Sequence, residues 1–103
     1  MPEKRERRRA ETDFLFKAIL SLQNSEECYE LFEDLCTVKE LDDMAQRLKV
    51  ASMLSQGKTY DQIVREVEIS TATISRINRC IQYGSGGYEK ILKRIEKTNG
   101  KEA

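Results

Sequence analysis

The sequence contains almost nothing that would interrupt a helix. Its one proline, Pro2, lies at the amino terminus, so the rest of the 103-residue chain is free to be helical. Apolar residues recur at the three- and four-residue spacing of an α-helix with one buried face. This spacing is clear at Phe14, Leu15, Ala18, Ile19 and Leu22. The periodicity predicts an all-α protein of about six helices.

Two capping motifs place helix starts inside the chain. Thr37-Val-Lys-Glu40 and Thr59-Tyr-Asp-Gln62 both have capping-box spacing, in which the first and fourth side chains bond each other's backbone amides. The first motif opens a long helix that Gly57 closes. The long helix carries apolar residues on two faces, so we expect it to pack against neighbours on more than one side. These residues are Leu41, Met44, Ala45 and Leu48, and then Val50, Met53 and Leu54.

A helix-turn-helix is predicted at about residues 59–83. The second capping motif opens a short helix, and the tight turn "EIS" at residues 68–70 follows it. Ser70 is expected to cap the next helix through its side-chain hydroxyl. Two short helices joined in this way are typical of DNA-binding proteins, with the second helix in the major groove. Its inner face would be formed by Ile74, Ile77 and Ile81.

The outward side of that second helix combines small side chains with arginines. Small residues let the helix approach a duplex closely, threonine methyls can meet thymine methyls, and arginine can bind guanine O6 and N7. The predicted DNA contacts are Ser70, Thr71, Ala72, Thr73, Ser75, Arg76 and Arg79, with Lys58 and Gln62 at the start of the first motif helix. A purely structural helix with exposed hydroxyls is the competing interpretation. The poor helix propensity of Thr and Ile disfavours it.

The charges are unevenly distributed although the net charge is zero. Residues 11–43 hold ten acids and two bases, whereas residues 69–101 hold seven bases and two acids. No acid occurs from Ile69 to Gly87. A neutral average argues against a nonspecific polycation, and the basic segment still allows contact with phosphate. The basic head, with Arg5 and Arg7–Arg9, is either a DNA-binding arm or a disordered tail.

Composition limits the organisation and the chemistry. A chain of this length forms one domain at most. We expect a flexible basic head at 1–11, a single helical DNA-binding domain at 12–97 and a flexible tail at 98–103. Dimerisation helices would occupy about 12–56 and 88–97. The three cysteines form no CxxC pair and histidine is absent, so free thiols are expected and no metal site. No apolar run is long enough for a membrane span or a secretory signal, which predicts a cytoplasmic protein.

The stretch "LDDMAQRLKVASMLSQGKTYDQIVREVEISTATISRINRCIQYGSGGYEKIL" resembles the Trp repressor superfamily, and within it the Trp-repressor-like YerC/YecD proteins. The order of long helix, glycine, helix-turn-helix and terminal helix is similar. The resemblance implies an all-α intertwined homodimer in the bacterial cytoplasm and at the nucleoid. It also implies binding to operator DNA and repression of transcription, with L-tryptophan as corepressor in the founding members. A core shared between two chains would suit the lean apolar content of this chain.

The resemblance further implies a ligand pocket. Arg47 and Arg76 match two arginines that enclose the indole, and Thr37 matches a threonine near the amino-acid backbone. Ile77 replaces a glycine that lets the ring lie close, and Cys80 replaces a serine that meets the ammonium group. Ile77 would crowd the ring, and a thiol is a poor ammonium partner. We therefore expect no tryptophan binding, no required cofactor, and another small corepressor or none.

Alternatives remain for the function and for Arg47. The same helices could form a protein-interaction or antitoxin-like module, which should not bind random duplex. An enzyme is disfavoured because the sequence has no histidine, no activated Cys or Ser arrangement and no phosphate loop. Arg47 could instead pair with Asp43, one helical turn earlier, or with an acid of a partner chain.

Overall fold

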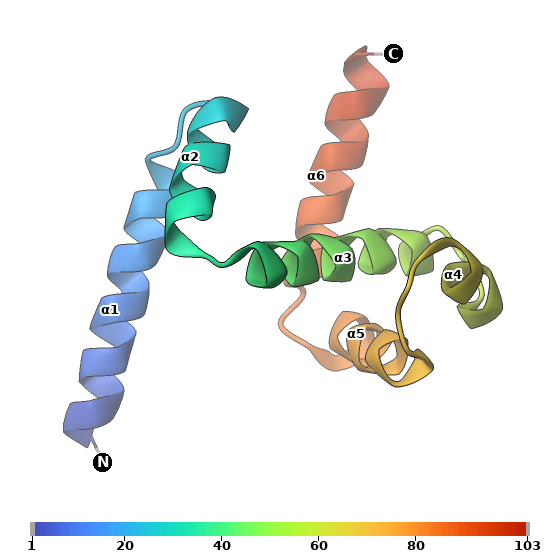
Figure 1. Cartoon of the computed structure of the whole chain (residues 1–103), viewed down its shortest axis with the longest axis horizontal. Coiled ribbons are helices and arrows are strands. Elements are labelled where there is room, and N and C mark those ends of the chain that lie inside the picture. Colours follow the sequence, from blue (N-terminus) through green and yellow to red (C-terminus); the bar gives the residue numbers. More distant parts are fainter. Residues whose placement is uncertain (1, 103) are drawn as a thin grey trace. The chain divides into compact units, whose positions relative to one another are not determined.

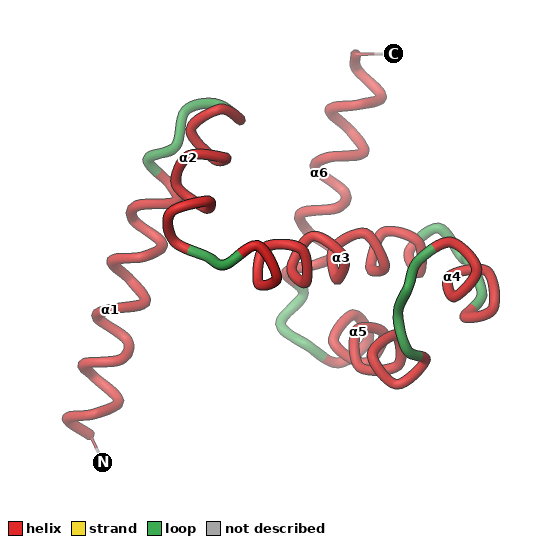
Figure 2. Tube along the Cα trace, viewed as in Figure 1, coloured by secondary structure: helices red, strands yellow, loops and turns green. Residues whose placement is uncertain are grey.

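The computed structural model describes the backbone of residues 2–102 and the side chains of residues 6–97. This part of the chain forms six α-helices and no strand (Figures 1 and 2). The helices are α1 Pro2–Leu20, α2 Ser25–Leu35, α3 Val38–Ser55, α4 Tyr60–Glu66, α5 Thr71–Tyr83 and α6 Gly87–Glu102. The predicted all-α class is therefore confirmed. The chain divides into two compact units, Met1–Leu41 and Asp42–Ala103, which are described separately.

Local capping interactions define where the inner helices begin and end. The Thr37 hydroxyl accepts from the Glu40 amide at 3.1 Å, and the Glu40 carboxylate accepts from the Thr37 amide at 2.9 Å. Hydrogen bonds to the Glu40 carboxylate, first from the Thr37 backbone amide and then from the Thr37 side chain, hold the pKa of Glu40 below its ordinary value. Thr59 and Gln62 make the same reciprocal pair. Beyond α3, Gly57 has φ +87°, a conformation that favours glycine. Both predicted capping boxes are confirmed.

The first unit leaves its apolar side chains uncovered. None of its described residues is buried, and Phe14 is 75% exposed. The large apolar side chains exposed in this unit are Phe14, Phe16, Leu20, Tyr29, Leu35 and Val38. Several exposed large apolar side chains in one small unit are typical of a surface that packs against another chain.

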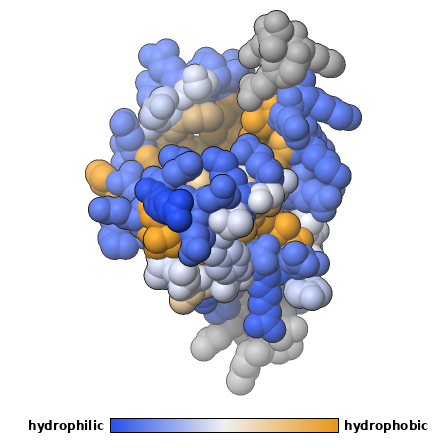
Figure 3. Space-filling model, turned by 90° about the vertical axis from the view of Figure 1, so that its right-hand side faces the viewer, coloured by the Kyte–Doolittle hydropathy of each residue, from blue (hydrophilic) through white to orange (hydrophobic). Residues whose placement is uncertain are grey.

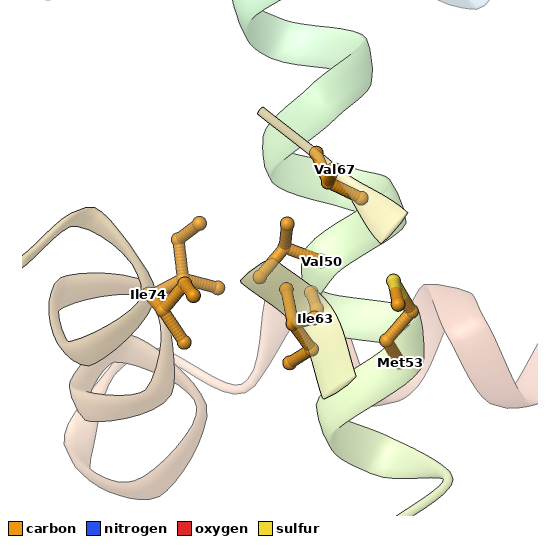
Figure 4. Packing of buried hydrophobic residues seen from close by; sticks show 7 residues of the cluster. Val50, Met53, Ile63, Val67 and Ile74 are labelled. Carbon is orange, nitrogen blue, oxygen red and sulfur yellow. The ribbon is translucent and has the colours of Figure 1, made fainter. Parts of the chain in front are cut away.

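The second unit has a small, well-buried core. Val50 and Met53 of α3, Ile63 of α4 and Ile74 of α5 point toward one another (Figure 4). The complete cluster is Val50, Ala51, Met53, Ile63, Val67, Ile74 and Ile77. The isoleucines of the second motif helix thus face inward, as the sequence predicted, and they hold α5 against α3 and α4.

One of the two apolar faces of α3 is uncovered within the chain. Val50 and Met53 lie on the buried face, whereas Met44 and Leu48 lie on the other side and Leu48 is 38% exposed. On the surface seen in Figure 3, apolar side chains remain visible between hydrophilic ones. Helix α3 therefore packs one apolar face into the core of its own chain. Its second apolar face is exposed and available to another chain.

The ends of the helical chain differ from the predicted boundaries. We expected a flexible head at 1–11, but α1 begins at Pro2 and continues without a break. Glu, Arg and Ala are good helix formers, and proline is tolerated in the first turn, so the head can extend the helix. Helix α6 likewise extends past residue 97 to Glu102. Flexibility in solution and the single domain at 12–97 stay predictions, and the Arg5 side chain lies outside the described part.

Candidate nucleic-acid interface

Helices α4 and α5 form the predicted helix-turn-helix, joined by the short segment at residues 67–70 (Figure 2). The Ser70 hydroxyl accepts from the Thr73 amide at 3.2 Å and shares a hydrogen bond with the Thr73 hydroxyl at 2.9 Å. Ser70 is therefore the cap of α5, as predicted. Val67 and Ile74, on either side of the turn, are both buried in the core. The turn is thus held by a cap and by apolar packing together.

A side chain from α3 also holds this turn. Gln46 Nε2 donates to the backbone carbonyl of Glu68 at 3.0 Å, across 22 residues of sequence. A bond of this kind satisfies a carbonyl that the turn leaves without a helical partner. It attaches the turn that precedes α5 to the long helix α3.

The outward face of α5 gathers five of the predicted contact residues. Ala72, Thr73, Ser75, Arg76 and Arg79 line one open hollow of about 440 Å³. The two remaining members on this helix, Ser70 and Thr71, are exposed at its amino-terminal end. All seven predicted contacts on the second helix are thus placed at or beside a single open surface.

The guanidinium groups on this face are not neutralised by the chain itself. Within residues 6–97, neither Arg76 nor Arg79 makes an ion pair or a hydrogen bond. The reason lies in the sequence, because no acid occurs between Glu68 and Glu89. All their N–H donors are therefore available to an external acceptor such as a phosphate or a guanine.

The two predicted contacts from the first motif helix have structural roles. Lys58 Nζ lies 3.3 Å from a carboxylate oxygen of Glu66, at the far end of α4. The side-chain oxygen of Gln62 accepts from the Thr59 amide in the capping box. Contacts from Lys58 and Gln62 to DNA stay a prediction.

Tyr83, the last residue of α5, is not among the contacts predicted from the sequence. Its side chain is 82% exposed. It follows Arg79 by four residues and Arg76 by seven, so it lies on the same side of the helix. Extending the outward stripe by one more turn would have identified it. Tyr83 adds a phenol hydroxyl and an aromatic ring at the carboxyl-terminal end of the exposed face.

The predicted ligand-pocket residues of the second unit differ in burial. Ile77 is only 2% exposed and belongs to the core, whereas Cys80 is exposed. Cys80 lines a hollow of about 450 Å³ with Leu48, Tyr88, Ile91 and the glycine-rich loop at 84–87, but Arg47, Arg76 and Ile77 do not line it. Thr37, in the first unit, caps α3. Within the described residues Arg47 makes no ion pair, so the alternative pairing with Asp43 is not formed inside this chain.

The comparisons with known proteins agree with this geometry. The family model of the Trp repressor protein matches residues 10–96.

The chain belongs to the Trp repressor family.

The uncharacterised protein YerC of Bacillus subtilis (strain 168) is one relative of this Trp repressor family member. The two sequences are 53% identical over 88 residues, which cover 85% of each chain. A crystal structure of a Trp repressor candidate from Staphylococcus aureus matches with a TM-score of 0.81 and 53% identity, covering 84% of this chain and 87% of that one. A TrpR-like protein from Eubacterium eligens ATCC 27750 matches with a TM-score of 0.79 and 45% identity, covering 82% and 87%. The resemblance read from the sequence is confirmed.

Membership in the Trp repressor family favours regulation over catalysis. The family is one of regulators and not of enzymes. No helix of the described chain is both long and apolar enough to cross a membrane. In this family member, helices α4 and α5 are therefore the candidate functional site.

The cap of α5 provides a first test of this geometry. Ser70→Ala removes the acceptor for the Thr73 amide and should lower the free energy of unfolding by about 0.5–2 kcal/mol. Ser75→Ala changes an exposed serine of the same helix that makes no cap, and should change it by less than about 0.5 kcal/mol. Urea titrations followed by circular dichroism would measure both values. Equal losses for the two variants would contradict the capping role.

Proposed function

We propose that this protein is a transcriptional regulator that binds operator DNA as a homodimer through α4 and α5. It acts as a repressor in the bacterial cytoplasm, at the nucleoid. The observation that carries the proposal is the acid-free outward face of α5, on a capped helix-turn-helix of a Trp repressor family member. Among the described side chains, Arg76 and Arg79 on this face have no ion-pair partner. Such a face can enter the major groove without repulsion from carboxylates.

Uncovered apolar surface supports the homodimer. The first unit buries none of its described side chains, and Met44 and Leu48 of α3 are exposed. A second copy of the chain could cover these faces, as expected for intertwined chains that share one core. Two recognition helices related by a two-fold axis would then meet two half-sites about one helical turn of DNA apart.

Binding to duplex DNA tests the proposal directly. Gel-shift titration with random duplex at low salt should show a shift, because phosphate contacts give nonspecific affinity that falls with salt. Genome-wide footprinting of the tagged protein would then identify the operators and the regulated genes. A protein-interaction module using the same helices would leave the DNA unshifted, and that result would refute the proposal.

The two arginines are expected to contribute to specific binding. Arg76→Ala or Arg79→Ala should each weaken operator binding by about 1–3 kcal/mol if the side chain contacts a base, and a lost phosphate contact should reduce the salt slope by about one. Thermal melting should change little, because neither side chain makes an ion pair within the described chain. Lys49→Ala removes the same charge from an exposed position on α3 and serves as the control. Large stability losses with unchanged binding would assign the arginines to structural contacts.

We also propose that L-tryptophan is not the corepressor. Ile77 occupies the core instead of leaving room for an indole ring, and Cys80 offers a thiol where an ammonium group needs an oxygen. Isothermal calorimetry should therefore detect no tryptophan binding up to millimolar concentration, and operator affinity should be unaffected by tryptophan. A micromolar isotherm would disprove this. The regulator then needs no cofactor, or responds to another small molecule.

A further inference from the structure

The side chains around the hollow on α5 form a restricted chemical set. Arg76 and Arg79 are pure donors. Ser75 adds a hydroxyl, and Ala72 adds a methyl group. None of the five lining residues carries a carboxylate or a carboxamide. The two carboxamides of this helix, on Asn78 and Gln82, do not line the hollow.

Thr73 carries a methyl group beside a hydroxyl that is already hydrogen-bonded. Its hydroxyl oxygen lies 2.9 Å from the Ser70 hydroxyl, with which it shares a hydrogen bond beside the cap of α5. One donor or acceptor site of that hydroxyl is thus used within the chain, whereas the methyl is available for an apolar contact. Together with Ala72, one turn from Arg76, Thr73 adds methyl groups to the lining of the hollow.

This set matches two of the four bases in the major groove. Guanine presents two acceptors, N7 and O6, which the fork of an arginine satisfies, and thymine presents a methyl group. Adenine is read best by a carboxamide that both donates and accepts, and cytosine by a carboxylate that accepts. The hollow has neither group, so its bidentate donors and methyl groups favour guanine and thymine, while the Ser75 hydroxyl can meet any base.

The spacing along α5 limits how far apart the bases contacted by its two arginines can lie. Three residues separate Arg76 from Arg79, which is about 4.5 Å along the helix axis at about 1.5 Å per residue. Base pairs follow one another at about 3.4 Å. We infer that each operator half-site presents guanines to Arg76 and Arg79 within one or two base steps of each other, with a thymine methyl against Ala72 and Thr73. This inference rests on the proposed function, and it names the DNA chemistry that the same face selects.

Base analogues in the footprinted half-site test the inference with the full-length protein. Replacing a contacted guanine by 7-deazaguanine removes N7 and keeps base pairing. It should weaken binding at least about fivefold, within the range of a lost bidentate contact. The same replacement outside the footprint is the control. In Arg76→Ala and Arg79→Ala, the analogue should have no further effect at the guanine that the missing arginine contacted.

Replacing the thymine by uracil removes only the C5 methyl and should weaken binding about three- to fourfold, the value of one buried methyl group. Thr73→Ser keeps the hydroxyl bonded to Ser70 and removes one of the two methyl groups, so uracil should weaken its binding less than it weakens binding of the unaltered protein. Specific binding that is insensitive to both analogues would overturn the inference and leave the proposed function standing, since phosphate contacts and DNA shape would then suffice. Absence of any DNA binding would overturn both.

Discussion

Ile63→Ala is expected to lower the free energy of unfolding by about 2–5 kcal/mol. Ile63 has no exposed surface and lies among side chains from α3 and α5 (Figure 4). Truncation would leave a cavity that the surrounding helices cannot fill, because α4 is short and both of its ends are held, by a capping box and by the turn. The core has only seven members among the described residues, so losing one is a large fraction of its packing.

The neighbouring residue supplies a matched control. Val64→Ala alters the next position of the same helix, but its side chain is exposed and should lose less than about 1 kcal/mol. Urea-induced unfolding of both variants would be compared at the same protein concentration. Because α5 is held by the same core, Ile63→Ala should also weaken DNA binding near physiological temperature. Similar unfolding midpoints for the two variants would show that this core does not stabilise the helix-turn-helix.

Leu48→Glu is expected to convert the proposed homodimer into monomers. Leu48 is exposed in the single chain on the face of α3 that its own core leaves free. In a two-fold dimer the change would place one carboxylate from each chain in an apolar interface, at a cost of several kcal/mol for each ion. Two such costs are comparable with the whole association energy of a micromolar dimer, about 8 kcal/mol. Light scattering should give the mass of one chain in place of two.

Two further measurements keep this prediction decisive. Lys49→Glu introduces the same side chain at the adjacent exposed position of α3 and should leave the dimer intact. If Leu48→Glu does not fold, the melting temperature of the unaltered protein should still rise with protein concentration, as linked folding and association require. A melting temperature independent of concentration, with the mass of a monomer, would exclude the dimer.

Interactions between neighbours in sequence were readable before the structure. The capping boxes at Thr37 and Thr59, the Ser70 cap and the closing Gly57 all appear at the predicted positions. Each depends on groups within four residues of one another, so residue type and spacing are enough to specify it. The inward isoleucines of α5 were predictable for the same reason, since helical periodicity assigns a residue to a face.

The sequence was less informative where a residue could serve either of two purposes. The predicted DNA contact of Lys58 stays untested, and the structure adds an ion pair with Glu66 that the sequence did not indicate, because α4 brings residues eight apart within reach. Tyr83 ends α5 just before the glycine-rich loop, and its exposure on the arginine side of the helix is seen only in the structure. A charged or aromatic side chain can bind several kinds of partner, and the packing of the surrounding helices determines which partner lies within reach.

By itself, the sequence determined that this is an all-helical protein with a capped helix-turn-helix and an acid-free, arginine-bearing second helix, because helix period, caps and charge are local properties. Only the tertiary structure decided that Gln46 holds the turn through the Glu68 carbonyl and that the inner face of α5 packs against Val50 and Ile63. It also decided which face of α3 its own chain covers. These features join residues far apart in the chain, and their energies depend on which surfaces meet. Spacing along the sequence cannot specify that.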